Sequence, residues 1–355
     1  GGSYQKETWL SGNHDLDIFI QFPYKKYQHH SQTLATFIKK PLKKLFKSLT
    51  LVHGSRDYFQ YQDDSLTIEF IPILKISKAN QAHNITDVSP MHSIWINQFN
   101  FKDDIRLAKA FCKAQRVYGA ESYIQGFSGY LIELLTLYYQ GFENFIQAAS
   151  QWKPKVVLDV EHHLKDPLQE LNVSKIVSPL VVVDPVDPTR NVAAVVSDEK
   201  FNLFIQRAKA YLQKPSGSFF IVQPLKIPAG ATVLHLQPLE GKRDVVGSKL
   251  LKAYTYLCQK LITEGFVLKK SGWNFESFWF VVTPLVLPPT KLIYGPPQSM
   301  KEALKAFEKK HGKASFKGKQ SYVIVSRDVR DLRLFLQRLI NDKNVASRVT
   351  SVTLE

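Results

Sequence analysis

Two carboxylates spaced two residues apart, with a third on a separate stretch, are the side chains best placed for chemistry. Asp15 and Asp17 lie in Asp-Leu-Asp-Ile-Phe-Ile, and the alternation of this segment predicts a strand with both acids on one face. Glu69 lies in a second predicted strand, residues 65–74. Acids arranged in this way can hold two divalent cations roughly 4 Å apart, as phosphoryl transfer from a nucleoside triphosphate requires. The sequence therefore predicts Asp15, Asp17 and Glu69 as catalytic, metal-binding residues.

A small turn precedes the first acid. Gly2-Ser3 is followed by eleven residues and then Asp15. Backbone N–H groups in such a turn can approach a triphosphate, and the Ser3 hydroxyl can bond a phosphate oxygen. Lys6 lies close behind and can offset phosphate charge. Each feature alone is weak, because an Asp-x-Asp strand is more often a solvated edge and Gly-Ser is usually only a turn. Their combination predicts a nucleotide site.

The third carboxylate has an alternative. Glu69 could be an exposed strand residue, with Asp63 or Asp64 holding the metal instead. Those two acids lie at the start of the predicted strand, in what reads as a turn, which favours Glu69.

Composition limits the class of protein. The chain has 355 residues, enough for two or three domains, and a formal net charge of +16. That excess fits a polyanionic partner, either nucleic acid or, less often, an anionic membrane, although a basic but ordinary enzyme is also compatible. The two cysteines, Cys112 and Cys258, indicate neither a disulfide framework nor a zinc site, which predicts a reducing, cytoplasmic compartment. No apolar run approaches 18 residues, so no membrane helix is predicted.

Hydrophobic patterning predicts an α+β protein of three domains: 1–103 (α/β), 104–213 (mostly helical) and 214–355 (α/β). Helices are expected over residues 31–47, 104–118, 199–213, 246–264 and 299–311, with one longer helix inside 126–152. Strands are expected over 232–236, 266–270, 277–286 and 321–325, after a linker at 214–218. The order of elements in the last domain suggests an RNA-recognition-like sandwich by shape only. From residue 301 to the end there are 13 Lys or Arg against 6 Asp or Glu, so this part is the most basic of the last domain.

Several blocks carry a family resemblance. Residues 2–19 resemble the opening signature of archaeal CCA-adding enzymes, class I of the polymerase-β-like nucleotidyltransferases. Further blocks similar to this family are Ser89-Pro-Met-His92, Val117-Tyr-Gly-Ala-Glu121, Gly126-Phe-Ser-Gly-Tyr-Leu-Ile-Glu-Leu-Leu135, Val183-Asp-Pro-Val-Asp-Pro-Thr-Arg-Asn-Val-Ala-Ala194 and Gly295-Pro-Pro-Gln298. The similarity runs from residue 1 to about residue 330.

The resemblance implies a function and a fold. It implies a polymerase-β-like palm, a helical nucleotide-pocket domain and an α/β C-terminal region that binds the acceptor arm of tRNA. The implied reaction is template-independent addition of C, C and A to the tRNA 3′ end from CTP and ATP, with two Mg²⁺ ions. A homodimer is possible.

The resemblance also implies roles for single residues. Gly2, Ser3 and Lys6 would bind the triphosphate, and Asp15, Asp17 and Glu69 would hold magnesium. His92, Lys109 and Tyr118 would contact the incoming nucleotide, and Arg190 would help to read the base or hold the nucleotide.

This sequence departs from the family pattern in three ways. The first carboxylate is usually Glu and is here Asp15, whereas the third is usually Asp and is here Glu69. Lys6 replaces the usual Arg, so a bidentate phosphate fork becomes a point charge. The few dozen largely helical residues expected before the Gly-Ser turn are not in this sequence, which suggests a missing N-terminal segment.

Two other functions and several ordinary explanations stay open. One alternative is a poly(A)-type nucleotidyltransferase acting on other RNA, and another is a catalytically impaired tRNA-binding protein. The pairs His29-His30 and His162-His163 are expected at the surface. The lysines between Lys39 and Lys47 form a solvated helix face or meet RNA phosphate. Asp184 and Asp187 are expected to be turn residues that fix the loop presenting Arg190.

Overall fold

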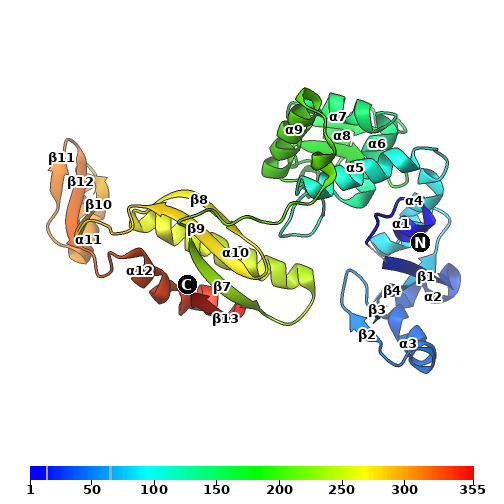
Figure 1. The fold of residues 1–355 in the computed structure, drawn as a ribbon, viewed down its shortest axis with the longest axis horizontal. Helices are drawn as coiled ribbons and strands as arrows, with labels where there is room; N and C mark the ends of the chain where they lie inside the picture. Colours follow the sequence, from blue (N-terminus) through cyan, green and yellow to red (C-terminus); the bar gives the residue numbers. More distant parts are fainter. Residues whose placement is uncertain (13–14, 64–65) are drawn as a thin grey trace. The chain divides into compact units, whose positions relative to one another are not determined.

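The computed structural model describes residues 1–12, 15–63 and 66–355. The chain forms two compact units, Gly1–Pro224 and Leu225–Glu355 (Figure 1). The three predicted domain ranges remain predictions, and Asp64 lies outside the described residues.

A four-stranded sheet in the order β1-β4-β3-β2 forms the base of the first unit. Its strands are β1 (Asp15–Pro23), β4 (Thr67–Lys75), β3 (Tyr58–Gln62) and β2 (Thr50–Val52). β1 and β4 are parallel, and their register pairs Asp17 with Glu69. The even-numbered side chains of both strands, such as Ile20 and Phe70, pack with helix α3. Because side chains alternate along a strand, the three acids lie on the opposite face. The two predicted strands are confirmed over the described residues.

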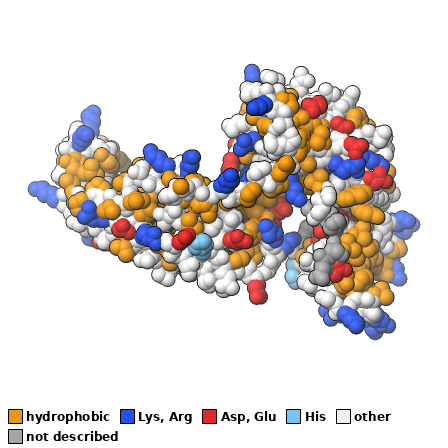
Figure 2. Space-filling model, in the orientation of Figure 1, with side chains coloured by type: hydrophobic (Ala, Val, Ile, Leu, Met, Phe, Trp, Pro, Cys, Tyr) orange, Lys and Arg blue, Asp and Glu red, His pale blue; other side chains and the backbone are white. Residues whose placement is uncertain are grey.

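Helix α3 (Leu34–Leu45) covers that apolar face of the sheet, after α2 (Tyr24–Tyr27) and the 3₁₀ turn η1 (Gln28–Thr33). Its buried side chains include Ile38 and Leu42. The opposite side of the helix and the residues after it expose Lys39, Lys40, Lys43, Lys44 and Lys47. None of these lysines forms an ion pair with another described residue. Figure 2 shows Lys and Arg side chains gathered on the surface where α3 lies in Figure 1.

A buried ion pair connects the sheet to the next helix. The Arg56 guanidinium donates to both carboxylate oxygens of Asp87, and it also donates to the Ser31 hydroxyl at 2.7 Å. Asp87 lies in η3 (Ile85–Val88) and also accepts from the backbone N–H of Leu74, in β4, at 2.8 Å. Breaking a buried pair leaves an uncompensated charge, so this contact holds the end of β4 firmly to the start of helix α4 (Ser89–Ile96).

The rest of the first unit is mainly helical. Its helices α5 (Lys102–Ala114), α6 (Gly129–Tyr138), α7 (Phe142–Ser150) and α9 (Asp198–Gln213) pack around an aromatic core. The single helix predicted within residues 126–152 is wrong. Gly141 has φ 121°, a backbone conformation that a helix cannot contain and that glycine adopts readily, so the chain turns between α6 and α7. α5 is also shorter than predicted and stops before Arg116, whose φ is 60°.

Short elements complete the first unit. β5 (Val156–Asp159) and β6 (Leu180–Val183) form a parallel pair, and α8 (Pro167–Glu170) and η4 (Val173–Lys175) lie between them in sequence. The predicted linker does not leave the unit, because Phe219 and Phe220 in η5 (Gly217–Phe220) pack against the helical core. No helix within the described ranges is long and apolar enough to cross a membrane.

The second unit has two sheets. The larger, in the order β13-β7-β9-β8, combines β7 (Thr232–Pro238), β8 (Val267–Trp273), β9 (Ser277–Thr283) and β13 (Val349–Leu354). It shares a core with α10 (Arg243–Glu264), α12 (Leu332–Ile340) and α13 (Lys343–Ala346). The smaller, in the order β10-β12-β11, is formed by β10 (Thr290–Pro297), β11 (Ser315–Lys317) and β12 (Gln320–Ser326) and carries α11 (Lys301–His311). The predicted strands and helices are present, while β10, β11, β13, α12 and α13 were not predicted.

Candidate active site

The three predicted carboxylates line one cavity of about 230 Å³. Ser3, Lys109 and Tyr118 are also in its wall, with Thr8, Trp9, Leu10 and Lys113. Burial raises the pKa of Asp17, and the Asp15 carboxylate raises it further. Burial also raises the pKa of Glu69, and Asp17 adds to the effect. The acids therefore destabilise one another's charge, and a cation placed among them would relieve that repulsion.

The donor set suits a divalent metal ion, although the side chains do not converge on one point as they lie. Among the residues the structure describes, no three His, Cys, Asp or Glu side chains are grouped closely enough to hold an ion. Glu69 instead accepts a hydrogen bond from the Gln60 amide at 3.1 Å. Carboxylate oxygens are the ligands that Mg²⁺ prefers. The acids thus fit a divalent cation by ligand type and by their shared cavity.

Asp63 is not placed like Glu69. Its carboxylate accepts from the backbone N–H of Leu66 at 2.9 Å, as in a turn, and it lines neither of the cavities described here. Among the described acids, Glu69 is the one beside Asp15 and Asp17.

The Gly-Ser turn lies directly against Asp17. Gly2 begins the one-turn helix α1 (Gly2–Gln5) with φ +58°. A Cβ at this position would lie 1.6 Å from Asp17 Oδ2, so only glycine fits both the backbone and the contact. The absence of a side chain brings the backbone of the turn against the carboxylate, while Ser3 faces the carboxylate cavity.

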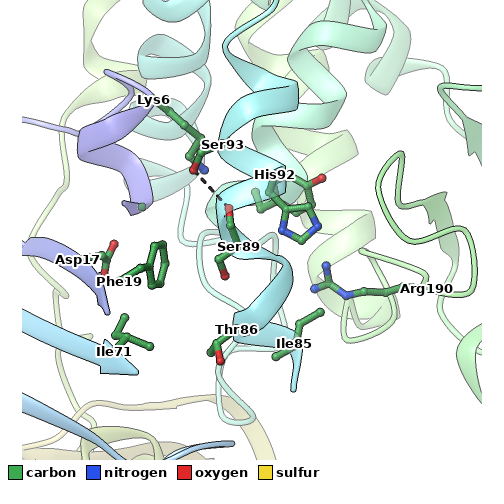
Figure 3. Close-up of a pocket in the computed structure, with 12 residues that line it drawn as sticks. Lys6, Asp17, Phe19, Ile71, Ile85, Thr86, Ser89, His92, Ser93 and Arg190 are labelled. Atoms are coloured by element: carbon green, nitrogen blue, oxygen red, sulfur yellow. Dashed lines mark hydrogen bonds between the residues drawn. The ribbon is translucent and has the colours of Figure 1, made fainter. Parts of the chain in front are cut away.

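A second cavity of about 300 Å³ adjoins the first at Asp17. Gly2 and Lys6 line it from α1 and the residue after it, Phe19 from β1 and Ile71 from β4; His92 lines it from α4. Figure 3 shows Asp17 and Phe19 on one side of this space and Arg190 reaching from a loop toward His92 on the other. The second cavity therefore has an acidic end on the sheet and a basic end formed by α4 and the Arg190 loop.

A buried carboxylate, Asp184, organises the basic end. Its Oδ2 atom is 2.9 Å from His92 Nε2 and accepts from the Arg190 guanidinium at 2.8 Å. The Tyr130 hydroxyl donates to the other oxygen at 3.2 Å, and the Tyr130 ring lies 4.2 Å from the His92 ring, centroid to centroid. Burial opposes ionisation of Asp184, but its contacts with His92, the Val186 N–H and Arg190 outweigh it and lower its pKa to about 2. Asp184 also accepts from the Val186 N–H at 3.0 Å, so it fixes its own turn as well as the side chains of His92 and Arg190.

A second buried carboxylate, Glu133, binds two of the lysines that were predicted to bind the nucleotide. Lys6 Nζ donates to Oε2 at 2.5 Å, and Lys109 Nζ donates to Oε1 at 2.6 Å. Burial alone would raise the pKa of Glu133, but the two ammonium groups hold it below its ordinary value. Glu133 was not among the residues predicted from the sequence. Its signal is a single acid inside the apolar run Leu131-Ile-Glu-Leu-Leu135, where a buried charge requires a partner.

The ten predicted site residues thus gather around two adjoining cavities. The carboxylate cavity holds Ser3, Asp15, Asp17, Glu69, Lys109 and Tyr118, and the second cavity holds Gly2, Lys6, His92 and Arg190 together with Asp17. Burial raises the pKa of Tyr118 to about 12, so its hydroxyl keeps its proton and can donate. The residues that sequence reasoning missed, Tyr130 and Glu133, hold the predicted ones in place.

Known proteins match this chain over most of its length. The model for the second domain of tRNA nucleotidyltransferases matches residues 103–221. A CCA-adding enzyme of Nanoarchaeum equitans is 36% identical over 323 residues, which cover 88% of this chain and 79% of that protein. A CCA-adding enzyme of Pyrobaculum aerophilum is 32% identical over 369 residues, covering 98% of this chain and 84% of that protein. The chain belongs to the family of archaeal CCA-adding enzymes.

The comparison confirms the resemblance expressed by the sequence motifs. A further relative, the CCA-adding enzyme of Methanosarcina barkeri, is 31% identical over 87% of this chain and 71% of its own. Among solved structures, a cytoplasmic RNA terminal U-transferase matches 63% of this chain and 85% of that chain with a TM-score of 0.45 and 14% identity, too low a likeness to assign a function. As a CCA-adding enzyme, the chain is a mixed α+β nucleotidyltransferase with sheets and helices in several parts.

Replacement of Gly2 by alanine tests the contact with Asp17. We expect Gly2→Ala to lower nucleotide addition at least about a hundredfold, because the new methyl group would displace the Asp17 carboxylate. The matched control is Gly318→Ala, at a similar φ of +62° but with open space around the added carbon. Both variants carry the same backbone strain, so equal losses of activity would contradict the account. The measurement is the single-turnover rate of nucleotide addition to tRNA, with melting temperatures to confirm folding.

Proposed function

We propose that this CCA-adding enzyme uses CTP and ATP to add C, C and A to the 3′ end of tRNA. The tRNA 3′-hydroxyl attacks the α-phosphate of the incoming nucleotide, and pyrophosphate leaves. The observation that carries the proposal is the pairing of Asp17 with Glu69 across parallel strands, on the sheet face that meets the Gly-Ser turn.

The carboxylate cavity would hold the metal and the reacting groups. Asp15, Asp17 and Glu69 would hold two Mg²⁺ ions, which when bound lower the pKa of the attacking hydroxyl and neutralise charge on the phosphates. Ser3, in the wall of this cavity, would supply a hydroxyl, and the backbone N–H groups of the Gly-Ser turn would supply further donors to the triphosphate. Lys109 and Tyr118 also line this cavity, with the tyrosine hydroxyl as a neutral donor.

The second cavity would hold the rest of the nucleotide. His92 and Arg190 share the Asp184 carboxylate, so their N–H groups are fixed in direction before a nucleotide binds. An arginine presents several donors in a rigid fork, which can match the acceptor edges of C and A while mismatching U and G. Arg190 is about one-third exposed, so its guanidinium has room for a ligand besides Asp184.

The proposed binding of tRNA rests on the positive charge of the chain and on its membership of the family. We propose that the acceptor arm lies against the basic C-terminal region, where Lys and Arg outnumber Asp and Glu after residue 301. The cytoplasm is the proposed location, and a homodimer is the assembly that a measurement of molecular mass in solution would test. A poly(A)-type activity is not favoured, because the curated relatives are CCA-adding enzymes.

Product analysis tests the proposal directly. With tRNA lacking its CCA end, CTP, ATP and Mg²⁺, the chain should add three nucleotides and stop. Asp17→Ala should abolish addition while tRNA binding persists, because loss of a metal ligand should cost several kcal/mol in the transition state. Continued tailing would indicate a poly(A)-type enzyme. More than about a tenth of normal activity in both Asp15→Ala and Asp17→Ala would exclude the metal site proposed here.

A second prediction concerns base selection by Arg190. Arg190→Ala should lower the ratio of CTP and ATP incorporation to UTP and GTP incorporation at least about tenfold, with little change in tRNA affinity. Arg190→Lys keeps a cation near Asp184 but loses the fork, so it should lose selectivity too. The readout is single-nucleotide extension with each of the four triphosphates. An unchanged ratio in both variants would remove Arg190 from the selection of the base.

A further inference from the structure

One stretch of the first unit is strongly and exclusively basic. Residues 18–55 contain seven lysines and no Asp or Glu, so this stretch carries +7 of the formal net charge of +16. All seven lysines are exposed. The stretch runs from the end of β1 through α2, η1 and α3 to β2. Its positive charge therefore gathers on the layer that covers one face of the four-stranded sheet.

Five of these lysines form a single surface, the lysine face. The lysine face consists of Lys39, Lys40, Lys43, Lys44 and Lys47, on α3 and directly after it. The buried residues of α3, such as Ile38 and Leu42, lie on the other side of the helix, against the sheet. Figure 2 shows basic side chains gathered where Figure 1 places α3. No ion pair to another described residue uses these lysines, so the surface faces solvent with its charge uncompensated.

The spacing of the lysines has a cost in the free protein. Lys39 lies four residues before Lys43, and Lys40 lies four residues before Lys44. Like charges at this spacing are neighbours on a helix and destabilise it. The negative end of the helix dipole offsets part of this repulsion in the last turn. A bound polyanion would remove the remainder.

The lysine face does not serve the catalytic acids. α3 packs against the sheet face opposite to the one that carries Asp17 and Glu69. A helix with its side chains is about 10–12 Å across, whereas the screening length at physiological ionic strength is about 8 Å. The outer lysines therefore neither neutralise those acids nor reach a nucleotide bound among them.

Aromatic side chains border the lysine face toward α2. Phe37 on α3 is 45% exposed, and its ring centre lies 5.3 Å from that of Tyr27. Lys26 Nζ lies 5.2 Å from the centre of the Tyr27 ring. Exposed rings beside ammonium groups are typical of surfaces that bind RNA, where bases stack and phosphates meet cations.

We propose that the lysine face binds the phosphate backbone of a second RNA molecule, separately from the tRNA whose 3′ end enters the carboxylate cavity. This separation rests on the proposed function, which brings the tRNA end to the opposite face of the sheet. Rows of flexible ammonium groups suit a phosphate backbone and require no base sequence. An anionic membrane fits less well, because the apolar side of α3 is buried against the sheet and cannot enter a bilayer.

The test compares two variants that each lose four positive charges. The lysine-face variant combines Lys39→Gln, Lys40→Gln, Lys43→Gln and Lys44→Gln. The matched control changes four exposed lysines elsewhere in the first unit: Lys153→Gln, Lys165→Gln, Lys209→Gln and Lys214→Gln. The probe is a short RNA hairpin with a blocked 3′ end, and the number bound per chain is measured by sedimentation at about 50 mM salt, where phosphate contacts are strong.

The unsubstituted chain and the control should bind one hairpin more per chain than the lysine-face variant. Arginine at the same four positions should keep that hairpin, because the positive charge is kept. In the unsubstituted chain the affinity of this site should fall with salt with a log–log slope of about −2 to −4, at about −0.9 per phosphate contact. The KM for tRNA in CCA addition should be the same in the lysine-face variant and the control. Melting temperatures confirm that each variant is folded.

Three results would overturn the proposal. The first is an equal number of hairpins on the unsubstituted chain and the lysine-face variant. The second is a KM for tRNA raised more in the lysine-face variant than in the control, because the face would then belong to the tRNA site. The third is binding to vesicles of phosphatidylserine and phosphatidylcholine that the lysine-face variant loses while its RNA binding stays normal. Absence of CCA addition by an unsubstituted chain that still binds the extra hairpin would instead defeat the proposed function.

Discussion

The contact between Gly2 and the Asp17 carboxylate is the constraint on which the rest of the site depends. Asp17, in strand β1, lies directly against the Gly-Ser turn, and no side chain larger than a hydrogen atom fits at Gly2 beside its carboxylate. The parallel register with β4 then fixes Glu69 beside Asp17, and the period of two along β1 fixes Asp15 on the same face. Helix α3 seals the other face with apolar side chains, so the sheet has one face for packing and one for chemistry.

Two buried carboxylates extend this arrangement into the helices. Asp184 holds His92 and Arg190, and Glu133 holds Lys6 and Lys109. A buried acid is costly without partners, so each of these two carboxylates fixes the positions of the side chains that donate to it. The acids of β1 and β4 carry uncompensated negative charge, whereas the helical side supplies positive charge that is already oriented. A nucleotide with its metal ions has the complementary distribution of both signs.

Much of the site was predictable from the sequence, because its residues lie in local patterns. The alternation over residues 15–20 predicted the shared face of Asp15 and Asp17. The motif blocks contain His92, Tyr118 and Arg190, and the family resemblance implied Lys109 as well. Tertiary pairings had no local signal. Glu133 and Asp184 meet residues 127 and 92 positions away in the sequence, and only folding brings them together.

The fold was predicted less completely than the site. The apolar spacing over residues 126–152 fits one helix, but Gly141 divides it, because a glycine at positive φ costs little and allows α7 to fold back. Short strands such as β2 and β11 escaped prediction because they contain three residues each, too few to show a period.

The central claim is that Asp15, Asp17 and Glu69 act together on one pair of metal ions. In the family pattern that this sequence resembles, the first acid is usually the longer Glu and the third the shorter Asp. Here Asp15 and Glu69 have the opposite lengths, so the effects of changing the two side chains should be coupled. The decisive measurement is the rate of single-nucleotide addition, together with Mn²⁺ affinity, for Asp15→Glu, Glu69→Asp, the double variant and Glu69→Gln. We expect both single exchanges to lower rate and affinity, the double exchange to restore much of each, and a coupling energy of about 0.5–3 kcal/mol. A Glu69→Gln variant with nearly normal rate and Mn²⁺ affinity would contradict the account.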